Sequence, residues 1–149
     1  MGADLYIRSL NKPCQQKWKP LFNEAVKERD KHQRQTKEYK EAQKEVDLCY
    51  DQMYDSGYFR DSYNTGNVLW QFRLSWWEDV IPLLDKKRKL SVDKTEQLLA
   101  LLAERKDQFQ ESMTECSQED RVFFEKRAEE LRDFLKEAVD LGQPIECSL

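Results

Sequence analysis

The sequence contains few of the residues that interrupt regular structure or bind metals: four glycines, four prolines, four cysteines and one histidine, His32, among 149 residues. So few glycines and prolines argue against a β-rich or loop-rich fold. No apolar run approaches the roughly 20 residues that cross a bilayer. The opening MGADLYIRSL has neither a basic leader nor a long apolar stretch. The sequence therefore predicts a cytoplasmic protein without a membrane segment.

The scarcity of cysteine and histidine excludes several kinds of site. Cys14, Cys49, Cys116 and Cys147 form no C-x-x-C pair, which excludes a thioredoxin-like or zinc motif, and we interpret them as reduced thiols with Cys49 in a core stripe. Catalytic Ser/His/Asp or Cys/His groups need an imidazole, and a di-iron bundle needs histidines on two helices. His32 stands in an all-polar stretch, so it is interpreted as a solvated residue. We predict no metal and no cofactor.

Helical signals fill most of the chain. Apolar residues recur at three- and four-residue spacing in segments that predict a helix starting near Asn11 or Pro20, a second ending at Gly57, a third over 68–84, a fourth starting at Ser91 and a fifth starting at Ser117. The polar stretch 27–38 is either a hairpin tip or the middle of one long helix. The residues ADLYI at 3–7 allow one brief extended segment before the first helix.

These patterns predict a single all-α domain over residues 1–149, an antiparallel bundle of four to five helices. The third helix is expected to be broken or bent, because Ser75 and Glu78 have the spacing of a capping box and Pro82 cannot donate a hydrogen bond.

The run from Gly57 to Leu84 holds seven aromatic residues, including three of the four tryptophans. A site there would use the rings and the polar groups among them, which are Tyr58, Arg60, Asp61, Tyr63, Asn64, Trp70, Arg73 and Trp77. Rings and arginines are the residue types that anchor protein contacts and planar or anionic ligands. The simpler interpretation is that the rings fill the core, and their excess over what one helix can bury keeps the binding interpretation open.

Two further features have a structural and a functional interpretation. Glu78 and Asp79 follow Trp76 and Trp77 directly, and desolvation by these rings is one route to a catalytic acid. We favour a structural role, with Glu78 capping the helix and Asp79 pairing with Arg73 or Arg60. Basic residues outnumber acidic ones over 12–40, and the reverse holds over 93–141. Because acids interleave the basic stretch, a solvated face is favoured over a nucleic-acid surface.

The opening MGADLYI, together with YFRDSYN and LSWWEDVIPLLD, resembles small bacterial proteins grouped in uncharacterised families without an assigned activity. The resemblance covers the chain from Met1 to about Leu102. It implies a bacterial cytoplasmic origin and brings no catalytic residue, substrate or partner.

We therefore expect a non-enzymatic binding or protein–protein interaction module, whose surface near residues 58–67 engages a protein partner or a second copy of the chain. The alternative is a small-molecule binder with an aromatic and arginine pocket between the 58–67 loop and the 68–84 helix. A more distant alternative is an enzyme that uses Glu78 or Asp79.

Overall fold

A computed structural model describes residues 2–62 and 66–149 of the chain. The described residues form two compact units. The hairpin unit is Arg8–Tyr58, and the sheet unit joins the first strand to Phe59–Leu149. Whether the two units fold as the single domain that the sequence predicts stays a prediction.

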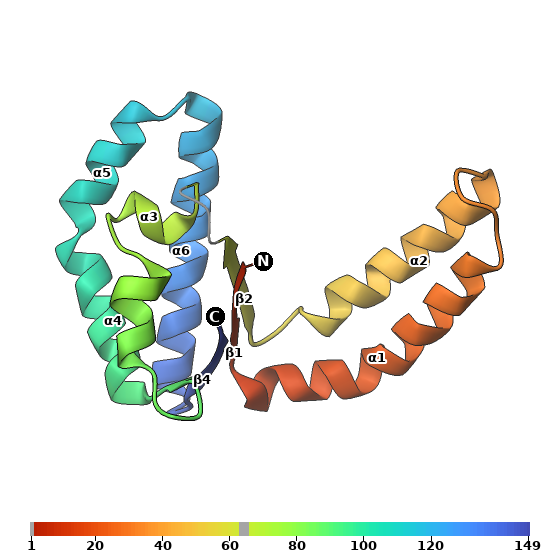
Figure 1. The fold of residues 1–149 in the computed structure, drawn as a ribbon, viewed down its shortest axis with the longest axis horizontal. Coiled ribbons are helices and arrows are strands. Elements are labelled where there is room, and N and C mark those ends of the chain that lie inside the picture. Colours follow the sequence, from red (N-terminus) through yellow and green to blue (C-terminus); the bar gives the residue numbers. More distant parts are fainter. Residues whose placement is uncertain (1, 63–65) are drawn as a thin grey trace. The chain divides into compact units, whose positions relative to one another are not determined.

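The hairpin unit consists of two antiparallel helices, α1 (Arg8–Asp30) and α2 (Lys37–Met53), which pack along their length (Figure 1). Helix α1 begins before the predicted start and contains both Pro13 and Pro20. The side chain of Thr36 accepts a hydrogen bond from the Tyr39 N–H and so caps α2. The polar stretch 27–38 is therefore a helix end and a hairpin tip, which settles the alternatives in favour of a turn.

The core of the hairpin unit is small. Three buried apolar residues, Ala25, Val46 and Cys49, form its centre, with the partly buried Trp18, Phe22 and Val26 packed around them. A row of four rings, which we call the aromatic row, runs along the hairpin. Its ring centroids lie 6.2 Å apart for Phe22 and Tyr50, 4.8 Å for Tyr50 and Tyr54, and 4.5 Å for Tyr54 and Tyr58.

Buried amide groups close the open end of the hairpin. Asn11 is fully buried, and its Nδ2 donates to the carbonyl oxygens of Met53 (3.1 Å) and Ser56 (3.2 Å). Gln15 Nε2 donates to the same Met53 oxygen (3.0 Å). These carbonyls lie at the end of α2, where the helix supplies no partners of its own. Helix α2 ends at Met53, and Gly57 adopts a positive φ of 65° in the turn that follows.

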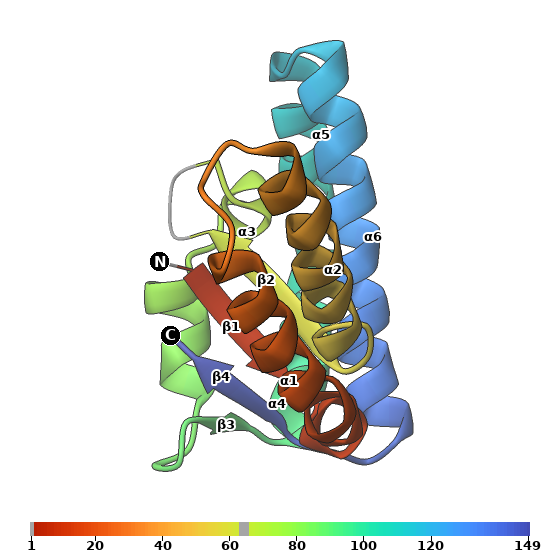
Figure 2. The same cartoon turned by 90° about the vertical axis from the view of Figure 1, so that its right-hand side faces the viewer.

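The sheet unit contains a four-stranded sheet in the order β2-β1-β4-β3 (Figure 2). Its strands are β1 (Gly2–Tyr6), β2 (Tyr58–Ser62), β3 (Lys89–Leu90) and β4 (Ile145–Ser148). Strand β4 is antiparallel to β1, with Leu5 opposite Cys147, and to β3, with Leu90 opposite Ile145. Side chains alternate between the faces, so Ala3, Leu5 and Ile7 are all buried on one face.

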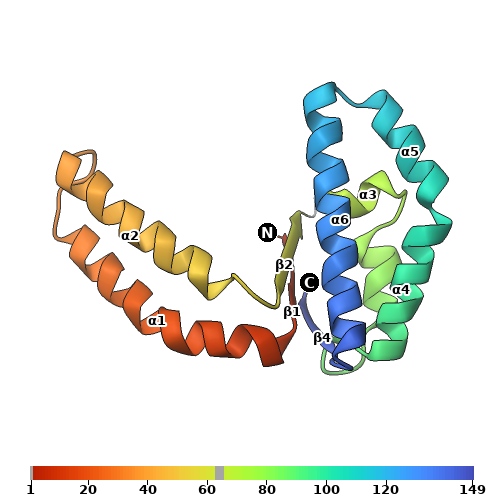
Figure 3. The ribbon, with the colours of Figure 1, turned by 180° about the vertical axis from the view of Figure 1, so that it is seen from behind.

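Helices α4 (Val92–Glu104), α5 (Lys106–Glu115) and α6 (Gln118–Asp140) pack together in the sheet unit (Figure 3). Ser91 and Ser117 cap α4 and α6 as the sequence predicts, by accepting from the Lys94 and Asp120 N–H groups. The predicted fourth helix bends at Arg105 into α4 and α5. The stripe of α6 is fully buried at Ala128, Leu131, Leu135 and Ala138.

The predicted 68–84 helix is broken into three short pieces. They are α3 (Val68–Gln71), the π-helical turn η1 (Trp76–Val80) and the 3-10 turn η2 (Ile81–Leu83). Ser75 caps η1 by accepting from the Trp77 and Glu78 N–H groups. Asp79 replaces the expected Glu78 as its reciprocal partner, because Asp79 Oδ2 accepts from the Ser75 N–H at 2.7 Å. In the wider π turn, the side chain that reaches back to the backbone N–H of the cap residue belongs to the fourth residue after the cap and not to the third.

The all-α prediction is correct for the helical majority of the chain and wrong about the sheet. The expected extended segment at residues 3–7 is strand β1, but it belongs to a four-stranded antiparallel arrangement and not to an isolated stretch. All four strands of the sheet are five residues or shorter, so their period-two pattern is too brief to stand out beside the helices. No helix in residues 2–62 and 66–149 is long and apolar enough to cross a bilayer.

Candidate functional site

Asp61 organises the segment between β2 and η1. Among the described residues, its buried carboxylate accepts four hydrogen bonds: Oδ1 from the N–H groups of Ser62 (2.9 Å) and Val68 (3.1 Å), and Oδ2 from the Leu69 N–H (3.3 Å) and the Trp76 indole Nε1 (2.9 Å). Backbone N–H donors are strong partners for a buried carboxylate. Asp61 therefore joins the start of α3 and the buried Trp76 to β2.

Beside Asp61 lies an open pocket of about 350 Å³, which we call the arginine pocket. Its lining includes Gly2 from β1, Arg60 and Ser62 from β2, Val68 from α3, and Phe123 and Arg127 from α6. The pocket thus joins segments that are far apart in the sequence and holds two guanidinium groups.

Arg127 connects α6 to β2. Its Nη2 donates to the Arg60 carbonyl oxygen and its Nη1 to Glu130. Its guanidinium carbon lies 4.5 Å from the centroid of the buried Phe59 ring, a cation–π arrangement. These contacts fix the position of Arg127 at the pocket wall.

Arg60 and Gly2 form the opposite part of the lining. Arg60 Nε lies 3.5 Å from Asp4 Oδ1, and the Arg60 side chain is about half exposed. A Cβ at Gly2 would lie only 2.6 Å from the Asp61 carbonyl oxygen and 3.0 Å from Arg60 Nε. Glycine is therefore required at position 2 for β1 and Arg60 to come this close.

On α6 an aromatic ring lines the pocket. Phe123 is 55% exposed, although α6 as a whole buries its apolar stripe. An exposed aromatic ring beside arginine side chains is a combination typical of protein-binding surfaces.

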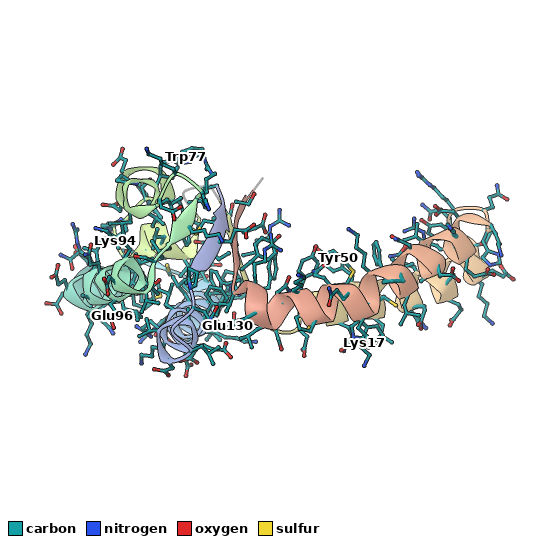
Figure 4. All side chains as sticks on the ribbon, turned by 90° about the horizontal axis from the view of Figure 1, so that it is seen from below. Lys17, Tyr50, Trp77, Lys94, Glu96 and Glu130 are labelled. Atoms are coloured by element: carbon teal, nitrogen blue, oxygen red, sulfur yellow. The ribbon has the colours of Figure 1, made fainter. Side chains whose placement is uncertain are left out.

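The other predicted site residues lie elsewhere. Trp77 is 56% exposed on η1, and Figure 4 shows it on the opposite side of the sheet unit from Glu130. Trp70 is 43% exposed on α3. Arg73, with a positive φ of 57°, pairs with Glu115 at 3.6 Å between Nη2 and Oε2, and not with Asp79.

Of the eight predicted site residues, Arg60 and Asp61 line the arginine pocket. Tyr58 belongs to the aromatic row of the hairpin unit. Tyr63 and Asn64 lie outside the described residues. Sequence reasoning missed Gly2, Phe123 and Arg127. The one signal for Phe123 is that it is an aromatic residue beside the apolar stripe of α6, next to Phe124.

The thiols of the chain are free, and within residues 2–62 and 66–149 no cluster of three His, Cys, Asp or Glu side chains has the arrangement of a metal site. Burial raises the pKa of the Cys147 thiol to about 12 and also raises the pKa of Cys49. Both thiols are therefore protonated and unreactive at neutral pH.

The raised pKa of Cys147 predicts a loss of stability in alkali. The ordinary thiol pKa is 9.0, so between about pH 9 and pH 12 the unfolded chain releases a proton that the folded chain keeps. The contribution of Cys147 to the free energy of unfolding is complete below pH 9 and falls by about 1.4 kcal/mol per pH unit above pH 9. Urea unfolding of the wild type and of Cys147→Ala at pH 8 and at about pH 10.5 measures this loss of free energy.

We expect the wild type to lose more free energy of unfolding than Cys147→Ala over that interval. Cys14→Ala, at a half-buried thiol of the other unit, is measured alongside as a second thiol-to-alanine substitution. Equal losses for wild type and Cys147→Ala would contradict the prediction.

Comparison of the chain with protein-family models, with curated protein sequences and with solved structures gives no match, so the resemblance to small bacterial proteins stays a prediction.

Proposed function

We propose that the protein is a non-enzymatic binding module of the bacterial cytoplasm, and that its arginine pocket recognises an acidic group of a protein partner. One observation carries the proposal: Arg60 and Arg127, from distant parts of the chain, line one pocket beside the exposed ring of Phe123. A guanidinium matches a carboxylate in shape and charge. The exposed ring of Phe123 would cover an apolar side chain next to that carboxylate.

The internal partners of Arg127 do not exhaust its donors. A guanidinium carries five N–H groups. Arg127 uses Nη1 for Glu130 and Nη2 for the Arg60 carbonyl oxygen. Donors of Arg127 therefore remain for an incoming anion. The existing contacts, which include Arg60 Nε near Asp4, hold both guanidinium groups in place before the anion arrives.

The positions of Glu78 and Asp79 favour a binding protein over an enzyme. The Asp79 carboxylate is engaged by the Ser75 N–H within η1, and the Glu78 side chain is on the exposed surface of the same turn. A structural role accounts for Asp79 without any reaction.

A small anionic molecule is the second candidate ligand. The observation that favours it is the volume of the pocket, about 350 Å³, which falls in the lower part of the range of small-ligand sites, about 300–1,000 Å³.

Selection of a random peptide library on the immobilised full chain tests the proposal. We expect the selected peptides to be rich in Asp and Glu beside an apolar residue. Their Kd should rise roughly tenfold or more for Arg60→Ala, because a charge-assisted pair is lost. Arg121→Ala is the matched control: it removes an exposed arginine of α6 that pairs with Glu125 outside the pocket, and binding should not change.

Peptides that bind Arg60→Ala as tightly as the wild type would overturn the proposal. Titration with citrate and with a nucleoside monophosphate, followed by NMR, separates the two candidates. Saturable binding of either anion, lost in Arg60→Ala and without any selected peptide, would favour the small-molecule site.

A further inference from the structure

The tip of the hairpin unit holds a second open pocket, of about 360 Å³, which we call the tip pocket. The tip is the turn between α1 and α2 (Figure 1). The pocket is lined by Arg34 and Gln35 of this turn and by Tyr39 and Lys40 of the first turn of α2. The four side chains end in a guanidinium, an amide, a phenol and an ammonium group, and each of these groups can donate a hydrogen bond. The pocket therefore offers donors and two positive charges to a single ligand.

Acidic residues near the tip pair with other cations and leave Arg34 and Lys40 without a counter-ion. Residues 27–40 contain six Lys/Arg and three Asp/Glu, and this interleaving made a solvated face the simpler interpretation of the sequence. Two of the three acids form short ion pairs with cations that do not line the pocket, at 2.6 Å for Glu28–Lys31 and 2.8 Å for Asp30–Arg29. Within the described part of the chain, neither Arg34 nor Lys40 forms an ion pair.

The acidic residues of α2 do not neutralise the pocket either. Glu38, the third acid of the stretch, is two residues before Lys40 and therefore about 200° away around the helix, on its opposite side. Glu41 is engaged by Lys44, at 3.3 Å between Oε1 and Nζ. Asp47 is seven residues beyond Lys40, about 10 Å along the helix axis. A net positive charge therefore remains at the tip pocket.

Hydrogen bonds fix the turn that carries the pocket. Thr36 Oγ1 donates to the Gln33 carbonyl oxygen at 2.7 Å and accepts from the Tyr39 N–H at 3.2 Å. The centroid of the Tyr39 ring lies 5.5 Å from the guanidinium carbon of Arg29, and Arg29 Nη1 donates to Gln43 Oε1 at 2.9 Å. The backbone of the turn and the Tyr39 ring are therefore held in place before a ligand arrives, which lowers the entropy cost of binding.

We infer that the tip pocket binds a phosphate group. A terminal phosphate presents three strong acceptor oxygens and a nucleic-acid strand presents successive phosphates, whereas a carboxylate has two oxygens. Donors spread over four residues therefore suit a phosphate better, and guanidinium and ammonium groups are its usual partners. Two sources provide this chemistry, a nucleic-acid strand and a free nucleotide. The inference concerns the hairpin unit alone and does not depend on the arginine pocket.

Titration of the isotope-labelled full chain with uridine 5′-monophosphate and with a short oligouridylate at low ionic strength, followed by NMR, tests the inference. We expect saturable binding of at least one probe, reported by the amide signals of residues 33–41. Arg34→Gln and Lys40→Gln should each raise the Kd roughly threefold or more, because each removes one charged donor. Both side chains are exposed, so neither change should disturb the fold, and circular dichroism checks this.

Lys12→Gln is the matched control. It removes an exposed cation near the start of α1, at the end of the helix away from the tip, and the Kd should not change. Arg60→Ala separates the inference from the proposed function, because it alters the arginine pocket and leaves the tip pocket as it is. A probe that binds in the tip pocket keeps its Kd in Arg60→Ala.

The two probes separate the two sources of phosphate. If the source is a strand, the oligouridylate binds more tightly than the monophosphate, and log Kd rises with log salt concentration with a slope of about 0.7 per contacted phosphate. Arg34→Gln should then lower that slope by about 0.7, because one phosphate contact is lost. Equal affinity of the two probes identifies a free nucleotide as the source.

Absence of binding of both probes would overturn the inference. So would a Kd that is the same in the wild type, Arg34→Gln and Lys40→Gln, or a Kd that Lys12→Gln raises as much as these two variants do. Binding that is lost in Arg60→Ala and kept in Arg34→Gln would place the ligand in the arginine pocket and reject the tip pocket as its site.

Discussion

Replacement of Asp61 by alanine is expected to lower the free energy of unfolding of the sheet unit by about 3–5 kcal/mol. The substitution removes the acceptor of the four hydrogen bonds that Asp61 receives from the described residues. It leaves the N–H groups of Val68 and Leu69 and the indole N–H of Trp76 buried without a partner. Each orphaned buried donor costs about 1–3 kcal/mol. Urea unfolding followed by tryptophan fluorescence measures the effect.

Asp61→Asn refines the test, because the amide keeps one acceptor oxygen and presents an NH₂ group in place of the other. Its loss should be smaller than that of Asp61→Ala. Asp133→Ala, which removes an exposed carboxylate from α6, is the control and should change stability by less than about 0.5 kcal/mol. A loss below about 1 kcal/mol for Asp61→Ala would mean that the carboxylate does not hold this segment together.

The second large effect is expected from Asn11→Asp, a substitution that hardly changes the shape of the side chain. Asn11 Nδ2 donates to the carbonyl oxygens of Met53 and Ser56 in a fully buried position, while Asn11 Oδ1 has no partner. A carboxylate there would face two carbonyl oxygens without a donor. We expect the hairpin unit to lose about 3–5 kcal/mol at neutral pH.

The loss should depend on pH in a defined direction. The introduced carboxyl is disfavoured in its charged form, so its pKa in the folded hairpin is raised above the value of about 3.9 in the unfolded chain. The deficit relative to the wild type should therefore be smallest near pH 4 and should grow as the pH rises. Hydrogen exchange of the α1 and α2 amides at pH 4 and pH 7 measures it.

Asn23→Asp serves as the control for Asn11→Asp, because Asn23 is exposed on the same helix. Its protection pattern should match the wild type at both pH values. Unchanged exchange of the hairpin amides in Asn11→Asp at neutral pH would contradict the role assigned to Asn11.

Local signals in the sequence predicted the helices well and the sheet poorly. Ser91 and Ser117 mark true helix starts, and the apolar stripe of α6 is buried as expected, because caps and helical spacing depend only on neighbouring residues. Strand β4 is four residues long and its partner β1 lies at the other end of the described chain. Pairing over such a separation leaves no periodic signal in either segment.

The sequence also predicted only some of the residues of the arginine pocket. Arg60 and Asp61 were named because they stand among aromatic residues, and both line the arginine pocket. Arg127 was missed because it resembles any solvated charge on a helix rich in charged residues; only the fold brings it to the Arg60 carbonyl oxygen. Asp61 also occupies an inward-facing strand position, where a polar residue obscures the alternation that would have identified β2.

The pairing of β1 with β4 imposes an order on biosynthesis. The hairpin unit is made early and depends on contacts between helices adjacent in the sequence, so it can fold while the ribosome is still translating the rest. The sheet unit buries three apolar side chains at the start of the chain, those of Ala3, Leu5 and Ile7. The sheet is complete only after residues 145–148 have been translated. Until then the apolar face of β1 is incompletely covered in the nascent chain, so we expect this strand to be a contact point for a chaperone.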